Sequence, residues 1–318
     1  MMPDSAIMPD FLRRPSMWFK NLQLYQLQQP FKLTPEQLHS MLDPQAAREC
    51  GSMEPSTYGW ERPLGRQGTL LTHAVNGHIM LCARSEERIL PAAVIRERLA
   101  HKVDEIEEAE SRKVRRREKE ELKDILIQQL LPQAFTKSSL TYAYIDIQGG
   151  WLIVDASSSK RAEELIDLLR DSLGSFKVKP VIPAHSPATV MTSWLAGSGP
   201  EDGFVVADEC ELRDPLDEGG IIRCRRQDLM GDEIAPHLKA GKQVVRLALE
   251  WAERITFVLC EDLSIKRLGF MDMIQEEAAE VAAEDDSARF DADFAIMSLE
   301  LGRFIPALLS QFGGVEQE

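Results

Sequence analysis

The sequence has no pair of cysteines at the short spacing that zinc sites and redox motifs require. Its five cysteines are scattered and odd in number, which argues against a disulfide framework and favours buried, reduced thiols. It also has no apolar run near the roughly 20 residues that span a bilayer. Residues 1–15 contain no apolar core of signal-peptide length. From these absences we expect a cytoplasmic protein.

The chain also lacks an overall positive charge. Lysine and arginine number 37 against 52 aspartates and glutamates, so the formal net charge is −15 and the pI is near 5.0. A basic footprint over the whole chain, as expected of many nucleic-acid-binding proteins, is therefore absent. The acidic residues, however, are concentrated between residues 272 and 293. Because screening limits electrostatic reach to about 8–10 Å at physiological salt, a local basic surface can still exist.

No set of residues predicts catalysis. The glycine-rich stretch at 197–200 lacks the Lys-Ser/Thr of a P-loop and the Rossmann spacing. His73 and His78 flank a turn and could share a metal, but no third ligand is evident, so we expect no metal site. No Ser-His-Asp set follows from spacing, and the carboxylates of a two-metal nuclease would have to come from the acidic segment, which is typical of a helix surface. We expect no enzymatic activity and no cofactor.

What the sequence does have is a basic stretch at 219–229, which reads GGIIRCRRQDL. In an extended strand Arg223 and Arg225 point to one face and Cys224 and Arg226 to the other, because side chains alternate. Cationic residues follow on neighbouring predicted elements. We expect a basic surface that holds DNA phosphates, built from the arginines of this stretch and from Lys239, Lys242, Arg246, Arg254, Lys266 and Arg267.

An upstream stretch at 77–86, GHIMLCARSE, aligns without gaps with residues 219–228. Both stretches precede a segment with helical spacing and then a pair of strands. Two interpretations are open: an internal duplication of about half a chain each, or chance similarity between two apolar strands. If the repeat is real, the binding chemistry is concentrated in the second copy, because Leu81 and Ala83 stand in the first where the second has arginines.

Length and patterning predict an α+β fold with antiparallel sheets, too large for one small core. We expect a disordered leader over 1–16, with Met17 as a second start. A first α+β half covers 17–90 and 132–175, interrupted by a projecting helical arm over 91–131. A second half, with the basic strand and C-terminal helices, covers 176–318.

The predicted elements of the first half are a strand, a helix, a long loop, two hairpins and an amphipathic helix. They cover, in that order, 17–27, 34–42, 50–68, the turns at Asn76-Gly77 and Gly149-Gly150, and 160–173. Thr34 and Gln37 predict a capping box at the start of the helix, and the Gly, Pro and Ser content of 50–68 indicates the loop. In the second half we expect strands over 177–182, 203–206, 219–225, 243–249, 254–260 and 265–270, with helices over 188–195 and 232–240. An acidic helical segment and a helix over 291–311 close the chain. The apolar stripe of that last helix needs a partner surface, in the same chain or in a second subunit.

The middle of the arm, from Glu107 to Glu121, is charged on every side, and a helix of that kind is not packed in a core. It contains the basic run Arg115, Arg116 and Arg117. One interpretation is a tip that touches DNA or a protein partner, and the other is a solvated helix with alternating charge pairs. After the arm, Phe135 lies in a polar turn near Lys137. An aromatic there could stack on a base or wedge into a groove, or it could pack under the loop.

Several blocks of the chain, in order from residue 17 to the C-terminus, resemble the bacterial recombination-associated RdgC family. They are MWFKNL at 17–22, LTHAVNGHIMLCAR at 71–84, ILP at 89–91, LLPQAF at 130–135, LLRDSLGS at 168–175, RRQDL at 225–229 and RFDADF at 289–294. The resemblance implies a DNA-binding protein without enzymatic activity. It implies a ring-shaped homodimer of α+β subunits that encircles double-stranded DNA with little sequence preference and restrains RecA-driven recombination.

Carried onto this chain, the family's DNA-contact and gate positions correspond to Phe135 and to Arg226 with Gln227. The resemblance also places the protein at the nucleoid. A competing hypothesis is an interaction protein whose acidic segment and arm regulate the recombinase, with DNA binding secondary. A third hypothesis is a metal-dependent nuclease.

Overall fold

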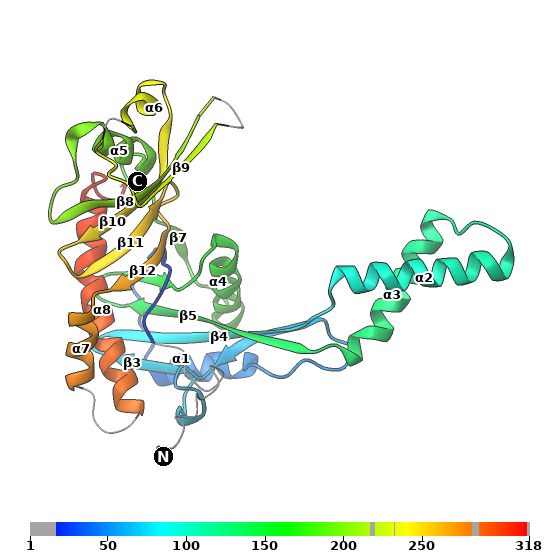
Figure 1. The fold of residues 1–318 in the computed structure, drawn as a ribbon. Helices are drawn as coiled ribbons and strands as arrows, with labels where there is room; N and C mark the ends of the chain where they lie inside the picture. Colours follow the sequence, from blue (N-terminus) through cyan, green and yellow to red (C-terminus); the bar gives the residue numbers. More distant parts are fainter. Residues whose placement is uncertain (1–16, 217–219, 232, 282–285, 317–318) are drawn as a thin grey trace, which may run out of the picture.

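The computed structural model describes residues 17–216, 220–231, 233–281 and 286–316, so the leader predicted over 1–16 lies outside the described residues. Within them the strands form two antiparallel sheets, which confirms the α+β class (Figure 1). The larger sheet contains β1 (Gln23–Leu27), β2 (Ser56–Glu61), β3 (Thr72–Val75), β4 (His78–Arg88), β5 (Thr136–Asp146), β6 (Trp151–Val154) and β7 (Val178–Pro180). The smaller sheet contains β8 (Phe204–Arg213), β9 (Ile221–Arg225), β10 (Gln243–Trp251), β11 (Ile255–Cys260) and β12 (Ile265–Phe270).

Both predicted hairpins lie in the larger sheet, whose strand order is β2-β4-β5-β6-β1-β7, with β3 also paired to β4. β3 and β4 are joined by Asn76 and Gly77, with φ values of 49° and 83°. Both residues are left-handed, the conformation that this dipeptide adopts readily in tight hairpins. β5 and β6 are joined by a turn with Gly150 at φ 73°.

The prediction of a long loop over 50–68 is wrong, because this stretch contains β2, which pairs with β4. Gly59, one of the glycines that indicated a loop, lies within this strand and allows close packing there. A Cβ at Gly59 would lie 2.8 Å from the Cα of Ala47, which donates its amide to the carbonyl of Trp60 at 2.7 Å. This glycine therefore lets a neighbouring backbone segment approach β2.

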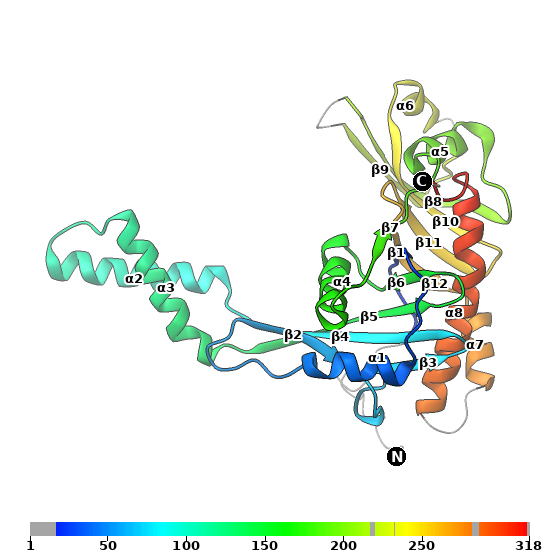
Figure 2. The same ribbon diagram turned by 180° about the vertical axis from the view of Figure 1, so that it is seen from behind.

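Helices α1 (Pro35–Leu42) and α4 (Ser159–Leu173) confirm two further predictions and cover one face of the larger sheet (Figure 2). Thr34 and Gln37 form the predicted capping box of α1, and Gly174 ends α4 in the left-handed conformation. The apolar residues of both helices are buried against that face of the sheet, in a core that includes Leu38, Leu42, Leu165, Leu169, Ile79, Leu81 and Val154.

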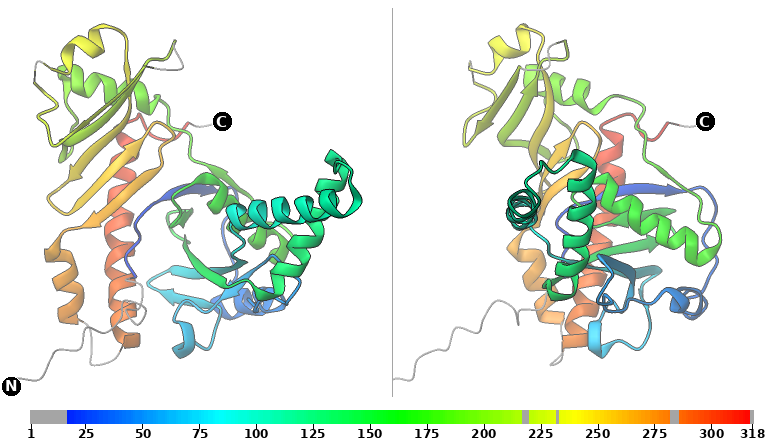
Figure 3. Two further views of the ribbon diagram at one scale, coloured as in Figure 1. Left: turned by 45° about the vertical axis from the view of Figure 1, so that its right-hand side comes forward. Right: turned by 90° about the vertical axis from the view of Figure 1, so that its right-hand side faces the viewer.

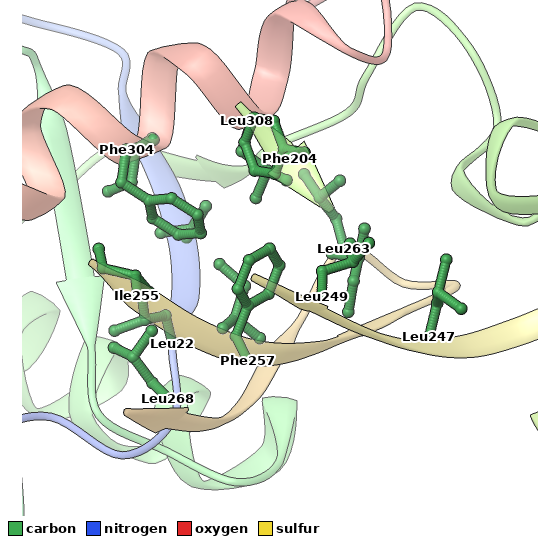
Figure 4. Packing of buried hydrophobic residues seen from close by; sticks show 14 of the residues in the cluster. Leu22, Phe204, Leu247, Leu249, Ile255, Phe257, Leu263, Leu268, Phe304 and Leu308 are labelled. Atoms are coloured by element: carbon green, nitrogen blue, oxygen red, sulfur yellow. The ribbon is translucent and has the colours of Figure 1, made fainter. Parts of the chain in front are cut away.

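The other face shares a second core with the smaller sheet and with α8 (Asp286–Ser310), which runs alongside both sheets (Figure 3). Figure 4 shows Phe304 of α8 among residues of the smaller sheet, and its ring centroid lies 4.9 Å from that of Phe257. The apolar stripe predicted for this helix is thus buried in its own chain. Its members are Phe294, Met297, Leu301, Phe304, Leu308 and Leu309.

The strand predicted over 17–27 is divided between the two sheets. Residues 23–27 form β1, whereas Leu22 exchanges backbone hydrogen bonds of 2.8 and 3.1 Å with Ile265 of β12. The amide of Leu268 also donates to the carbonyl of Lys20 at 2.8 Å. This short segment therefore closes the outer edge of β12 and joins it to the larger sheet.

The helical segment predicted over 91–131 is two helices, α2 (Ala92–Glu110) and α3 (Arg116–Leu130), which pack against each other. Ser111, with φ 49°, ends α2. This helical hairpin lies apart from both sheets, at the end of the long ribbon formed by β4 and β5 (Figures 1 and 3). Its charged residues pair with one another, as in the contacts of Arg112 with Glu118 at 2.6 Å and Lys113 with Glu107 at 2.6 Å.

Three further α-helices in the described part of the chain are α5 (Pro187–Ser193), α6 (Ala235–Lys239) and α7 (Asp272–Val281). The strand predicted over 203–206 continues to Arg213 as β8, and the helix predicted over 232–240 is shorter than expected. The two stretches compared for duplication occupy different places, since β4 is central in its sheet and β9 is an edge strand. Among the described residues, none of the helices has the length and apolar character needed to cross a bilayer.

Candidate nucleic-acid interface

The basic strand β9 presents its arginines on the outward face of the smaller sheet. The register places Arg225 opposite Glu209 and Arg223 opposite Glu211, so these four side chains share one face. Cys224, between the two arginines, is buried on the opposite side. The alternation expected from the sequence therefore positions the arginines, and β8 supplies the carboxylates beside them.

Glu211 organises three arginines. Its side chain is 7% exposed, and its carboxylate lies 2.8 Å from Nε of Arg223, 3.7 Å from Arg213 and 3.8 Å from Arg246. Burial acts to raise the pKa of Glu211, but the hydrogen bond from Arg223 and the charges of Arg246 and Arg213 outweigh it, so the pKa lies below its ordinary value. Glu211 therefore carries its charge at neutral pH and holds these guanidinium groups in place.

Glu209 performs a similar role for two further arginines. Its carboxylate lies 3.5 Å from Nε of Arg225 and 2.9 Å from Arg267. Arg267 comes from β12, so its side chain reaches across β10 and β11 to meet Glu209. The contact links β12 to β8, and the surface thereby gathers cations from β8, β9, β10 and β12.

We call this surface the arginine face. Its cations are Arg213, Arg223, Arg225, Arg246, Lys266 and Arg267. Its carboxylates are Glu209 and Glu211 at the centre, with Glu250 on β10 and Glu261 beside Arg213. These six cations outnumber the four carboxylates, in a chain whose net charge is −15.

The arginines of this face retain hydrogen-bonding capacity despite their ion pairs. The side chains of Arg223, Arg225 and Arg267 are 62%, 70% and 57% exposed. A guanidinium group has five N–H donors, and a contact with one carboxylate uses only some of them. The remaining donors face solvent at positions fixed by the carboxylates, an arrangement suited to phosphate oxygens.

Two other predicted residues lie where β9 ends. Arg226 has φ 54°, and the amide of Gln227 donates to the carbonyl of Asp208 at 3.3 Å. Both line a pocket of about 570 Å³ together with Val206, Ala207, Asp208, Asp228, Leu229 and Met230. The left-handed residue directs the chain away from β9, so these two residues line a site of their own beside the arginine face.

The predicted lysines of the same half are more dispersed. Lys242 donates to the carbonyl of Gly220 at 3.1 Å and lies 3.7 Å from Asp214, at the end of the β8–β9 pair. Lys239 is exposed at the end of α6. Arg254 is bound to the buried Glu300 of α8 through two hydrogen bonds of 2.8 and 2.9 Å, so it supports the fold.

The first-half residues predicted to touch DNA form separate groups. Phe135 follows the short turn over residues 131–134 that leaves α3 and is 85% exposed, and Lys137 is exposed on β5. Arg115, Arg116 and Arg117 lie at the start of α3, where Arg116 and Arg117 contact Glu120 and Glu121 at 3.5 and 3.3 Å. The structure brings the sheet arginines together and leaves the hairpin cations on another element.

The two turn histidines face separate carboxylates. Nε2 of His73 lies 2.8 Å from Asp291 of α8, and Nε2 of His78 lies 3.9 Å from Asp146. Within the described part of the chain, no group of three or more His, Cys, Asp and Glu side chains could hold a metal ion.

A family model described as "RdgC: Putative exonuclease, RdgC" matches residues 17–315. The chain belongs to the RdgC family. Three relatives of the family, all called recombination-associated protein RdgC, match along nearly their whole length. The Aeromonas hydrophila protein is 48% identical over 301 residues, which cover 95% of this chain and 99% of that protein. The Tolumonas auensis protein is 46% identical (95% and 100% covered), and the Sodalis glossinidius protein 42% (94% and 98%).

The resemblance to RdgC stated from the sequence is thereby confirmed. The description of the family model mentions an exonuclease, whereas the names of these relatives give no catalytic activity.

Sequence reasoning missed the carboxylates on which the arginine face depends. Glu209, Glu211 and Arg213 alternate with the buried Cys210 and Leu212, which is a strand pattern, but the predicted strand stopped at residue 206. The alternation from 209 to 213 was the available signal.

Proposed function

We propose that this protein binds double-stranded DNA without sequence preference through the arginine face, and that it restrains RecA-dependent recombination at the nucleoid. The observation that carries the proposal is the gathering of exposed guanidinium groups over Glu209 and Glu211. Contacts of this type go to phosphates and fix position without reading bases. The names of the relatives support a connection with recombination.

We further propose a ring-shaped homodimer with DNA in its hole, with Phe135 and Arg226 at contact or gate positions. Phe135 supports the ring because an aromatic that is 85% exposed on a monomer is suited to contact with DNA or a second copy. The ring can be tested by binding the protein to circular DNA and to linear DNA with free or blocked ends. At high salt, more protein should stay bound to circular DNA and to linear DNA with blocked ends than to linear DNA with free ends. Equal retention on all three DNAs would contradict encirclement.

Charge reversal tests the arginine face together with the residue beside it. R225E on the face and R226E next to it should together abolish DNA binding while the fold is kept, because both side chains are exposed and the ion pair of Arg225 is 3.5 Å long. A suitable control is K160E, since Lys160 is also exposed and pairs with one glutamate, Glu164, on α4. Equal DNA binding by the parent, the double variant and the control would contradict the proposal.

The second candidate function is a protein-interaction module that regulates the recombinase through the acidic segment and the α2–α3 hairpin. It is favoured by the pairing of the hairpin cations with neighbouring glutamates, since such pairs leave less free positive charge for DNA. Under this alternative the R225E/R226E protein still binds purified RecA in the absence of DNA.

We propose that the protein has no enzymatic activity. Prolonged incubation of end-labelled DNA with magnesium or manganese should leave the substrate intact. Shortened products that disappear with a chelator would instead support the exonuclease description.

A further inference from the structure

The α2–α3 hairpin is attached to the larger sheet where β4 leads into it and β5 leaves it. Arg88 and Thr136 are the outermost pair of β4 and β5, and beyond them the amide of Ile89 donates to the carbonyl of Phe135 at 2.8 Å. No residue of α3, which is described throughout, is buried, and Val103 is the buried residue of α2. The orientation of the hairpin therefore depends on this joint more than on packing against the sheets.

The guanidinium group of Arg88 fills the joint and donates to four carbonyl oxygens. Nε donates to Gly51 at 3.2 Å and Nη2 to Cys50 at 3.3 Å, both in the loop before β2. Nη1 donates to Leu131 at 3.1 Å and to Ala134 at 3.2 Å, at the two ends of the turn that follows α3. One side chain of β4 thus connects the larger sheet, the loop before β2 and the turn that follows α3.

The loop before β2, which accepts two of these bonds, is itself held by hydrogen bonds to β4. Glu86 is buried; its Oε1 accepts the amide of Cys50 at 3.1 Å and its carbonyl accepts the Cys50 thiol at 3.1 Å. The amide of Arg88 donates to the carbonyl of Pro55 at 2.8 Å. The loop that accepts from Arg88 is therefore a fixed support, and the bonds to Leu131 and Ala134 hold the hairpin against it.

We propose that Arg88 is a positioning residue that sets the orientation of the α2–α3 hairpin and thereby presents Phe135, the residue after Ala134, to its ligand. A planar guanidinium can satisfy carbonyls on two sides at once, whereas a lysine ammonium is a point donor and cannot span them. The effect on orientation stands independently, and the effect on binding rests on the proposed function.

Orientation is measured without DNA by electron–electron distance spectroscopy. Spin labels go on unnatural ketone residues at the exposed positions 108 on α2 and 171 on α4, which leaves the native cysteines untouched. We expect one narrow distance in the parent and a distribution at least about twofold wider in R88M and R88K. The matched control is R161K, because Arg161 makes comparable bonds within the body, to Thr141 at 2.8 Å and Leu140 at 2.9 Å. Unchanged widths in both Arg88 variants would overturn the inference.

Binding is measured for R88M, F135A and the double variant on the same duplex. We expect each single variant to lose about tenfold in affinity, within the range for one base–aromatic stack. The double variant should lose no more than either single variant, because both changes disable the same contact. Multiplied losses would show that Arg88 does not act through Phe135 and would overturn that part. If F135A binds normally, the DNA role of Phe135 fails, and the distance measurement alone decides the role of Arg88.

Discussion

Neutralising two arginines of the arginine face should flatten the salt dependence of DNA binding. The perturbation is R223Q with R225Q, which removes two charges and keeps polar side chains. Arg223 is paired with Glu211, but Arg213 and Arg246 remain beside that carboxylate, so its buried charge is not left alone. We therefore expect the variant to fold with a melting temperature close to that of the parent.

The magnitude follows from the number of guanidinium groups on the face. If each of the five arginines neutralises one phosphate, log Kobs falls with log salt at a slope of about −4.5 per copy of the face. Between 50 and 200 mM salt, that slope lowers the affinity by about 500-fold. With three arginines left, the slope is about −2.7 and the loss about 40-fold.

The assay is fluorescence anisotropy of a labelled duplex of unrelated sequence, titrated at four or more salt concentrations. K160Q serves as the control, because Lys160 is exposed and paired with one glutamate, Glu164, on another element. The control should keep the slope of the parent. A double variant with the same slope as the parent would refute the assignment of phosphates to this face, whatever its absolute affinity.

Three further outcomes follow from the same structure. E211Q should tighten DNA binding several-fold at low salt and steepen its salt dependence, because a carboxylate that competes with phosphate is removed; weaker binding in the same anisotropy assay would mean that positioning outweighs charge. Burial lowers the pKa of His73 below its usual 6.5, although Asp291 acts to raise it. Neutral His73 therefore contributes to folding stability above pH 6.5, and this contribution is lost as the pH falls through the folded-state pKa. Thermal unfolding should therefore show a smaller loss between pH 7.5 and 5.5 for H73Q than for the parent. F304A should cost about 3–5 kcal/mol of unfolding free energy in urea, since Phe304 is fully buried between α8 and the smaller sheet, and a loss below about 1 kcal/mol would contradict that packing.

The elements that sequence predicted best are those whose signals are local. The Asn76-Gly77 turn and the Thr34 capping box depend on residues within a few positions of each other, and both are present as expected. Gly59 misled because its role is to admit a backbone segment twelve residues earlier, around Ala47, and a glycine that permits close approach resembles a glycine in a loop. Tertiary proximity of this kind leaves little trace in a local pattern.

In the candidate site, too, local features were predictable from the sequence and features that depend on tertiary pairing were not. Alternation in β9 placed Arg223 and Arg225 on one face, but the carboxylates beside them depend on the pairing of β8 with β9. The contact of Arg267 with Glu209 crosses two intervening strands and depends on the order of all of them. Counting cations along the chain therefore found five of the six cations of the arginine face, whereas Arg213 and the anions that arrange the face required the assembled sheet.

The few residues before β1 have a structural role out of proportion to their number. The backbone around Leu22 occupies the free side of β12 and passes directly into the larger sheet. A chain trimmed beyond this point would leave a row of unsatisfied amides and carbonyls open to intermolecular pairing. Tags and truncations at this end are therefore best placed before residue 17, so that the protein does not polymerise through its own exposed strand.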